Sequence, residues 1–339
     1  MNSTSGVQNQ LQNATGSVAH YHQYHAEAVA LQGTLRAPIE QKIEQQIPLE
    51  INDRRGGHLT RTVSDVSIEG LISIKRAETR VSGSKIKGKY VTLATTIVEG
   101  LKVFEVLSVE RVISQVSTSH AEENGHLPKV TFLGSKFENL RISGIPVHIT
   151  YNFGVCPPPN QKDETYLANK DFVRATRDST QSILNRDVLF GLAKTENEQR
   201  NVRVSEVLSL IQSKDYQNLQ SGEKVATLQK LFPNDQRPRI TCSLVDSIDI
   251  SEVRKQLPRV ETVGHTLIIP DFGVVSLGEI EVGIESPKAP GYSMRGVSNG
   301  SSPKPSNYFE LTMLNMELGC IGDASVRAAQ SKGNGQTNP

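Results

Sequence analysis

The sequence predicts an α+β protein that is mainly β: a glycine-punctuated β-sandwich or open roll with a helical insertion. Two stretches, 58–153 and 238–322, contain alternating runs rich in Val and Ile that glycines interrupt. Between them, three consecutive prolines at 157–159 end the alternation, and residues with helical spacing come next. The 339 residues are enough for one large domain or two ordinary ones. The simplest arrangement is one β-domain, split in sequence by helices.

A near-duplicated phrase is the strongest strand signal. Residues 68–82 read IEGLISIKRAETRVS, and residues 98–112 read VEGLKVFEVLSVERV. Glycines inside such patterns predict bulges or bends, where a curved sheet turns. Related phrases begin near 137 and 272, which leaves a β-solenoid as an alternative fold. The irregular intervals between the phrases favour the sandwich or roll.

The domain boundaries follow from composition. Gln, Asn, Ser and Ala dominate residues 1–36, which we expect to be a disordered tail. The first part of the β-domain covers 37–155, the helical insertion 156–237 and the second part of the β-domain 238–322. Residues 323–339 are expected to be a second disordered tail. Within 37–51, apolar residues at i, i+4 and i+8 fit a short helix, and IPLEI fits a strand instead.

Charge and hydropathy exclude several classes of partner. The chain has 37 basic and 36 acidic residues, so no net field attracts nucleic acid or an anionic membrane. No apolar run approaches the roughly 20 residues of a membrane span. The N-terminus lacks the features of a secretory signal, and we expect a cytoplasmic protein unless a signal has been removed.

The cysteines indicate no cofactor. Cys156, Cys242 and Cys320 are far apart and form no CxxC motif. We expect them to be reduced and buried, and a bridge between Cys156 and Cys242 across the insertion is the alternative. The sequence therefore predicts no bound cofactor.

Candidate metal ligands occur in the segment HYHQYH. His20, His22 and His25 have a spacing at which neutral imidazoles bind zinc, copper or nickel. Their flanks look unfolded, so wrapping a metal would cost considerable chain entropy. We expect at most adventitious binding by a mobile tail.

Catalytic candidates are scattered rather than grouped in a motif. The sequence lacks a nucleophile elbow, a phosphate-binding loop and a dinucleotide fingerprint. An enzyme of unrecognised type would need groups from separate strands to converge beneath the insertion. The candidates for that convergence are His148, His265, Asp271 and Glu99.

Three phrases, VTLATTIVEGLKVFEVLSVERVISQVST, VTFLGSKFENLRISGIPVHI and YFELTMLNMELGC, are similar to β-rich bacterial proteins of unknown function. They more distantly resemble the choice-of-anchor P family of secreted actinobacterial proteins. The similarity covers about 62–153 and 265–322, and this chain departs from that family in lacking a secretion signal and in having the helices. The resemblance implies a β-domain in two halves and no particular activity.

The leading functional hypothesis is a non-enzymatic structural or protein-interaction protein, which assembles with itself or with a protein partner. An open sheet leaves edges that need partners or cover. An enzyme with a site between the sheet and the insertion is one alternative. The other is a small-molecule or lipid binder that uses a cavity in the β-domain.

Overall fold

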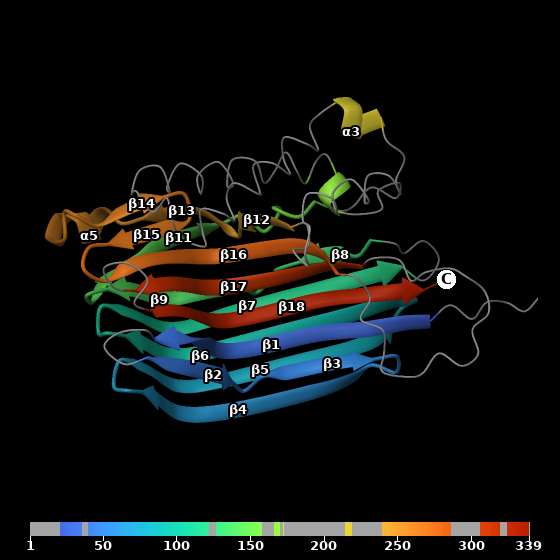
Figure 1. Ribbon diagram of the computed structural model, residues 1–339, viewed down its shortest axis with the longest axis horizontal. Coiled ribbons are helices and arrows are strands. Elements are labelled where there is room, and N and C mark those ends of the chain that lie inside the picture. Colours follow the sequence, from blue (N-terminus) through green and yellow to red (C-terminus); the bar gives the residue numbers. More distant parts are fainter. Residues whose placement is uncertain are drawn as a thin grey trace, which may run out of the picture.

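The computed structural model describes residues 21–35, 40–121, 127–157, 166–169, 172, 214–218, 239–285, 306–318 and 324–338. Most of them lie in β-strands, which form two large sheets and one small one (Figure 1). The mainly β class with sandwich-like sheets is therefore confirmed. The described ladders are antiparallel, unlike the parallel coils of a β-solenoid, so that alternative is wrong.

Sheet A has nine strands in the order β14-β15-β16-β17-β18-β1-β2, with β12 also paired to β16 and β3 to β1. Its strands are β1 (Tyr21–Leu35), β2 (Gln41–Gln46), β3 (Leu49–Asp53), β12 (Arg239–Ser243), β14 (Glu261–Val263), β15 (Thr266–Ile269), β16 (Gly273–Glu285), β17 (Ser306–Leu318) and β18 (Ala324–Asn338).

Sheet B has seven strands in the order β10-β9-β7-β6-β5-β4, with β8 paired to β7. They are β4 (Gly57–Ile68), β5 (Ile72–Ile86), β6 (Lys89–Val103), β7 (Leu107–Ala121), β8 (Lys129–Thr131), β9 (Lys136–Ile142) and β10 (Ile145–Pro146). A small third sheet joins β11 (His148–Tyr151) to β13 (Val245–Asp249), and helix α5 (Ser251–Gln256) follows β13.

Both predicted tails contain long strands, so the prediction of disorder is wrong for residues 21–35 and 324–338. These segments are β1 and β18, which pair with each other near the middle of sheet A. Their inward positions hold small residues such as Ala26, Ala28 and Ala328, all almost fully buried. Composition alone missed them, because alternating Ala, Gly and Ser give little hydrophobic signal. Residues 1–20 lie outside the described part of the chain.

The predicted insertion at 156–237 falls largely outside the described residues. Within it, the structure describes a 3-10 turn (Tyr166–Ala168), Phe172 and helix α3 (Lys214–Asn218). Tyr166 packs edge-on against Phe309 of β17, with 4.8 Å between ring centroids. Cys156 and Cys242 are free and buried, as predicted, and Cys320 lies outside the described residues.

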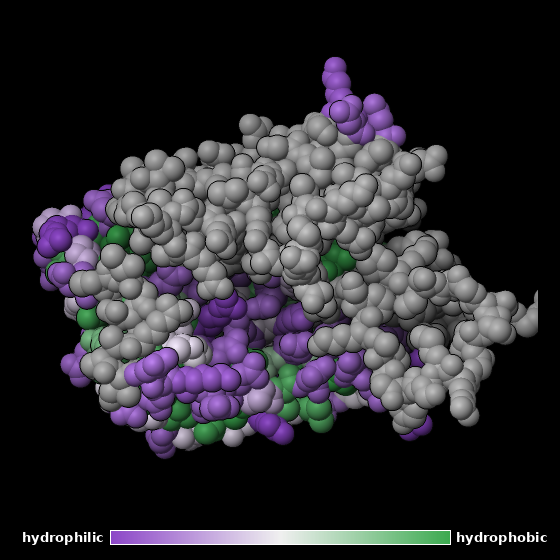
Figure 2. All heavy atoms as spheres, in the orientation of Figure 1, coloured by the Kyte–Doolittle hydropathy of each residue, from purple (hydrophilic) through white to green (hydrophobic). Residues whose placement is uncertain are grey.

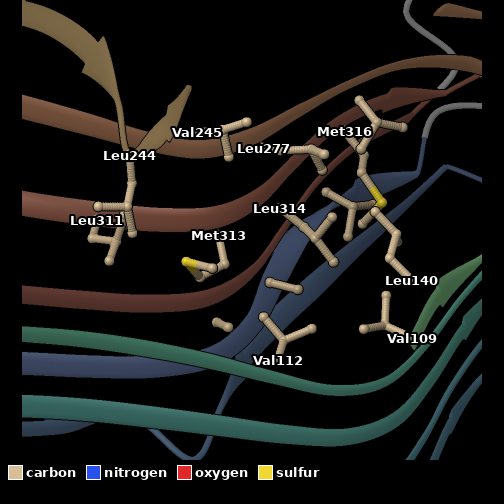
Figure 3. Packing of buried hydrophobic residues seen from close by; sticks show 14 of the residues in the cluster. Val109, Val112, Leu140, Leu244, Val245, Leu277, Leu311, Met313, Leu314 and Met316 are labelled. Carbon is tan, nitrogen blue, oxygen red and sulfur yellow. The ribbon is translucent and has the colours of Figure 1, made fainter. Parts of the chain in front are cut away.

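The main core lies where the two large sheets face each other. Leu314 and Met316 of β17 point toward Val109 and Val112 of β7 and Leu140 of β9 (Figure 3). All five side chains are at most 2% exposed. This packing fills the interior between the sheets at this point with side chains.

Hydroxyl groups join the two sheets where β18 crosses β6 and β7. Thr96 Oγ1 donates to the carbonyl oxygen of Gln330 at 2.6 Å. Ser331 Oγ donates to the carbonyl oxygen of Ser114 at 3.0 Å, and Ser114 Oγ donates to that of Leu311 at 3.1 Å. These contacts connect two neighbouring strands of sheet A, β17 and β18, directly to β6 and β7 of sheet B.

In each large sheet, a row of residues on adjacent strands has no register partner in the strand ladders. In sheet A the ladders skip Gly278, Met313, Ala329 and Ala30 on four adjacent strands. In sheet B they skip Asp65, Lys75, Gly100, Glu110 and Asn139. Several of these residues have positive φ, including Gly100 at 64° and Gly278 at 60°. The prediction that internal glycines mark bulges is confirmed at these two positions.

Candidate functional site

A pocket of about 600 Å³ lies at the end of the sandwich where the β6–β7 and β15–β16 turns meet α5. Apolar side chains form most of its wall. The lining residues are Phe104, Val106, Ser143, Gln256, Leu257, Pro258, Arg259, Val260, Ile269, Pro270, Asp271, Phe272, Leu318 and Ala324. The walls thus come from turns and strand ends of both large sheets and from the C-terminal end of α5.

Two hairpin turns place aromatic rings in this pocket. Phe104 has a φ of 49° in the β6–β7 turn, and its N–H donates to the carbonyl oxygen of Leu71 at 2.7 Å. Phe272 donates its N–H to the carbonyl oxygen of Ile269 at 3.1 Å, which closes the β15–β16 turn. The two rings are 6.3 Å apart and nearly perpendicular, a favourable aromatic geometry. This contact links the ends of the two sheets.

The chain after α5 forms the opposite wall. Leu257 donates its N–H to the carbonyl oxygen of Val253 at 2.7 Å, and Val260 donates to that of Leu257 at 3.1 Å. Arg254 Nη2 forms an ion pair with Glu261. This turn buries Val260 and fixes Pro258 and Arg259 at the rim.

The charged groups in the lining are Arg259 and Asp271, and both are exposed. The basic side chains of α5 are paired with carboxylates, Arg254 with Glu261 and Lys255 with Glu252. Arg259 belongs to none of the ion pairs formed within the described ranges. The pocket therefore combines apolar walls with one available guanidinium group at its rim.

The four catalytic candidates do not share a site. Glu99 faces outward on sheet B, between Arg76 at 3.7 Å and Arg111 at 3.6 Å. His148 is exposed on β11, and His265 is buried in the β14–β15 turn. Of the four, only Asp271 lines the pocket. Glu99 is on sheet B, His148 is on the small third sheet, and His265 and Asp271 lie beyond opposite ends of β15 in sheet A. This arrangement does not provide the hydrogen-bond reach that proton transfer among the four groups needs.

The predicted histidine trio is also divided. His20 lies outside the described residues. His22 is buried between the sheets, whereas His25 lies on the outer face of β1 beside Glu27. Alternation along β1 turns these two imidazoles to opposite faces, so they cannot ligate one ion together.

Sequence reasoning missed Phe104, Val260 and Phe272, which form the apolar wall of the pocket. A signal was present, because both phenylalanines occupy turns, in VFEVL and PDFG, where polar residues are usual. Only the fold shows that the two turns lie at the same end of the molecule.

These features define an antiparallel β-sandwich with an apolar pocket at one end. Residues 22–283 match the domain of unknown function DUF8256, and because this match spans more than half of the chain, the chain belongs to that family. No curated protein and no solved structure matches it. The similarity to the choice-of-anchor P family stays a prediction, since no finding links the two. Within the described ranges, no helix is long and apolar enough to cross a membrane.

Proposed function

We propose that this chain is a non-enzymatic binding protein that holds an apolar small molecule with an acidic group in the end pocket. The observation behind the proposal is the pocket itself. Its volume of about 600 Å³ falls within the range of roughly 300–1,000 Å³ that is typical of small-molecule sites. Apolar walls with a few polar groups at the rim are also typical of such sites.

The residues that line the pocket favour a binding role over a catalytic one. Its titratable groups are Arg259 and Asp271, both in contact with solvent. A general acid or base usually needs an environment that shifts its pKa toward neutrality. The packed core between the sheets also favours the end pocket over the sandwich interior as the ligand site.

The acidic group of the ligand is inferred from Arg259. A guanidinium group at the edge of an apolar pocket can pair with a carboxylate or sulfonate while the rest of the ligand is buried. Asp271, on the same rim, disfavours ligands with several negative charges near it. The expected ligand class is therefore an amphipathic anion of low charge rather than a sugar or a nucleotide.

The first test is a fluorescence titration with 8-anilinonaphthalene-1-sulfonate, which combines an aromatic body with a sulfonate. We expect saturable binding of one probe per chain to the full-length protein. The substitution Gln256→Trp places a large side chain at the pocket and should weaken binding by about tenfold or more, by filling space that the probe needs. Arg259→Gln should weaken it by about twofold to fivefold, as for an exposed ion pair.

The matched control is Glu252→Trp, which puts the same side chain on α5, at an exposed residue outside the pocket lining. Its affinity for the probe should equal that of the unmodified chain. Equal affinity of the Gln256→Trp protein would place the probe elsewhere and refute the proposal.

A second proposal is self-association through β4, the edge strand of sheet B. Within the described ranges β4 pairs with β5 alone, and most of its residues are exposed. Leu59 lies opposite Val81, which faces the core, yet it is 45% exposed. An exposed edge with an uncovered apolar side chain favours pairing with a second copy of the chain. Sedimentation of the full chain and a Leu59→Lys variant tests this proposal.

We also propose that the protein resides in the cytoplasm. The support is the reduced state of Cys156 and Cys242, which both lie in the core. Burial raises the pKa of both thiols, so they remain protonated and unreactive. Alkylation of lysates from the native source before and after unfolding tests it. Both thiols should label only after unfolding, and a disulfide would contradict the proposal.

A further inference from the structure

Three potential metal ligands meet on the outer face of sheet A. His25 and Glu27 are two residues apart on β1, so their side chains lie on the same face. Glu50 of β3 lies directly opposite Glu27. His25 Nε2 is 2.8 Å from Glu27 Oε1 and 3.5 Å from Glu50 Oε1. The three ligand atoms all lie within 4.8 Å of one another.

A neighbouring amide sets the orientation of the imidazole. His25 Nδ1 is 2.5 Å from Asn334 Oδ1 of β18, and a carbonyl oxygen can only accept a hydrogen bond. Nδ1 therefore holds a proton and donates it to Asn334. This leaves Nε2 directed at the two carboxylates, and a metal-binding histidine is commonly fixed by such a contact at its other nitrogen.

The surrounding row of side chains holds more negative than positive charge. Residues paired across adjacent strands, from β3 to β16, are Glu50, Glu27, Lys332, Glu310 and Glu281. Like charges directly opposite each other destabilise a sheet, as with Glu27 and Glu50. Lys332 Nζ lies 3.4 Å from Glu27 Oε1, between Glu27 and Glu310. Hydrophilic residues gather over β18 and β1 in the space-filling view (Figure 2).

We propose that His25 Nε2, Glu27 and Glu50 bind a Zn²⁺ ion that joins β1 to β3. One imidazole and two carboxylates are a normal ligand set for zinc. With Zn–N and Zn–O bonds of about 2.0–2.2 Å, tetrahedral ligands lie roughly 3.4 Å apart. The observed separations of 2.8 and 3.5 Å from Nε2 therefore need only small side-chain movements. Water completes the coordination.

The alternative occupant of the space beside Nε2 is a proton. An imidazolium would also satisfy Asn334 and both carboxylates, and it would need no metal. Zinc binding differs from protonation in one measurable respect: it requires the proton on Nε2 to leave, so a proton is released when zinc binds.

The experiment measures zinc binding to the full chain, purified without a histidine tag and stripped of metal, by isothermal titration calorimetry near neutral pH. We expect one zinc ion per chain, and a Co²⁺-loaded sample should show the visible absorption of a tetrahedral site. His25→Gln should weaken zinc binding by at least about tenfold. Glu50→Gln should also weaken it, and this side chain is 57% exposed, so its replacement leaves folding unaffected.

The matched control is His148→Gln, which removes an exposed histidine of another sheet and should leave zinc binding unchanged. Absence of binding to the unmodified chain would overturn the proposal. Binding that survives both His25→Gln and Glu50→Gln would overturn it as well, because the zinc would then be held elsewhere.

Discussion

The His22 ring lies between the two large sheets, stacked on Tyr90 at 4.5 Å and 4.9 Å from the ring of His120. Burial, reinforced by the nearby His120, lowers the pKa of His22 from 6.5 to about 3. The unfolded chain thus takes up a proton near its ordinary pKa, whereas the folded chain stays neutral. The contribution to stability is fully present above about pH 6.5 and is lost as the pH falls toward 3.

We expect this histidine to make the protein sensitive to mild acid. Between about pH 7 and pH 5, His22 should lower the free energy of unfolding by about 2 kcal/mol. Urea unfolding of the full chain at both pH values measures the change. His22→Phe retains an aromatic ring and should reduce the pH dependence by that amount. His148→Phe, at an exposed position, should not, and a similar pH dependence in all three proteins would contradict the assignment.

At the scale of single residues, the sequence singled out the histidine-rich segment but not its roles. Its sequence predicts a mobile tail, because the residues on its C-terminal side are mostly small or polar. Membership of β1 depends on pairing with β18, which comes some 300 residues later in the chain and is equally poor in large apolar residues. No local sequence pattern predicts this long-range pairing. The placement of His22 and His25 on opposite faces of β1 therefore follows only from the structure of the sheet.

At the scale of elements, the near-duplicated phrases adopt different structures. In IEGL, Glu69 and Gly70 form the turn between β4 and β5, with positive φ at both. In VEGL, Gly100 is the bulge near the C-terminal end of β6, with a φ of 64°. In both places the glycine adopts a left-handed backbone conformation. Pairing with neighbouring strands decides whether a turn or a bulge results.

This difference predicts unequal costs for the same substitution. A Cβ at Gly100 would lie 2.8 Å from Lys75 Cβ, whereas a Cβ at Gly70 would meet no atom within 4 Å. Gly70→Ala bears the left-handed strain alone, about 1–2 kcal/mol of unfolding free energy. Gly100→Ala adds a steric clash in the sheet, for a total of about 2–4 kcal/mol. Urea unfolding of the two variants measures both costs, and equal losses would show that the bulge accommodates a side chain.

The segment 37–51 illustrates how an ambiguous pattern is resolved. Its apolar spacing fits a helix, whereas IPLEI fits a strand; the structure confirms the strand for IPLEI with β3, and it places 41–46 in a further strand, β2. Ile47, with a φ of 43°, lies between the two strands. Both strands pair with β1, and backbone hydrogen bonding to that neighbour outweighs the helical spacing.

At the scale of the whole molecule, the split β-domain was predictable and the closure of the sandwich was not. Alternation of apolar residues identified most strands of sheet B, because they follow one another as hairpins. Sheet A joins the first and last described strands, and its middle consists of segments predicted to be tails. The end pocket depends on both sheets, which is why only Asp271 among its residues was a candidate from sequence.

Self-association through β4 is a prediction about the whole molecule. Sedimentation velocity on the full chain should show a dimer that dissociates on dilution. Leu59→Lys should shift the protein to monomer, since a charged residue on an edge strand opposes pairing. Leu133→Lys is the control, because Leu133 is 64% exposed and lies outside β4. A monomer at all concentrations would rule out this interface.

A crystal structure of the full chain grown with 8-anilinonaphthalene-1-sulfonate tests whether the end pocket holds an apolar anion. We expect the aromatic body of the probe to lie against Phe104, Val260 and Phe272, with its sulfonate near Arg259. Clear density for the probe at another surface, or a pocket filled by the protein's own side chains, would contradict it.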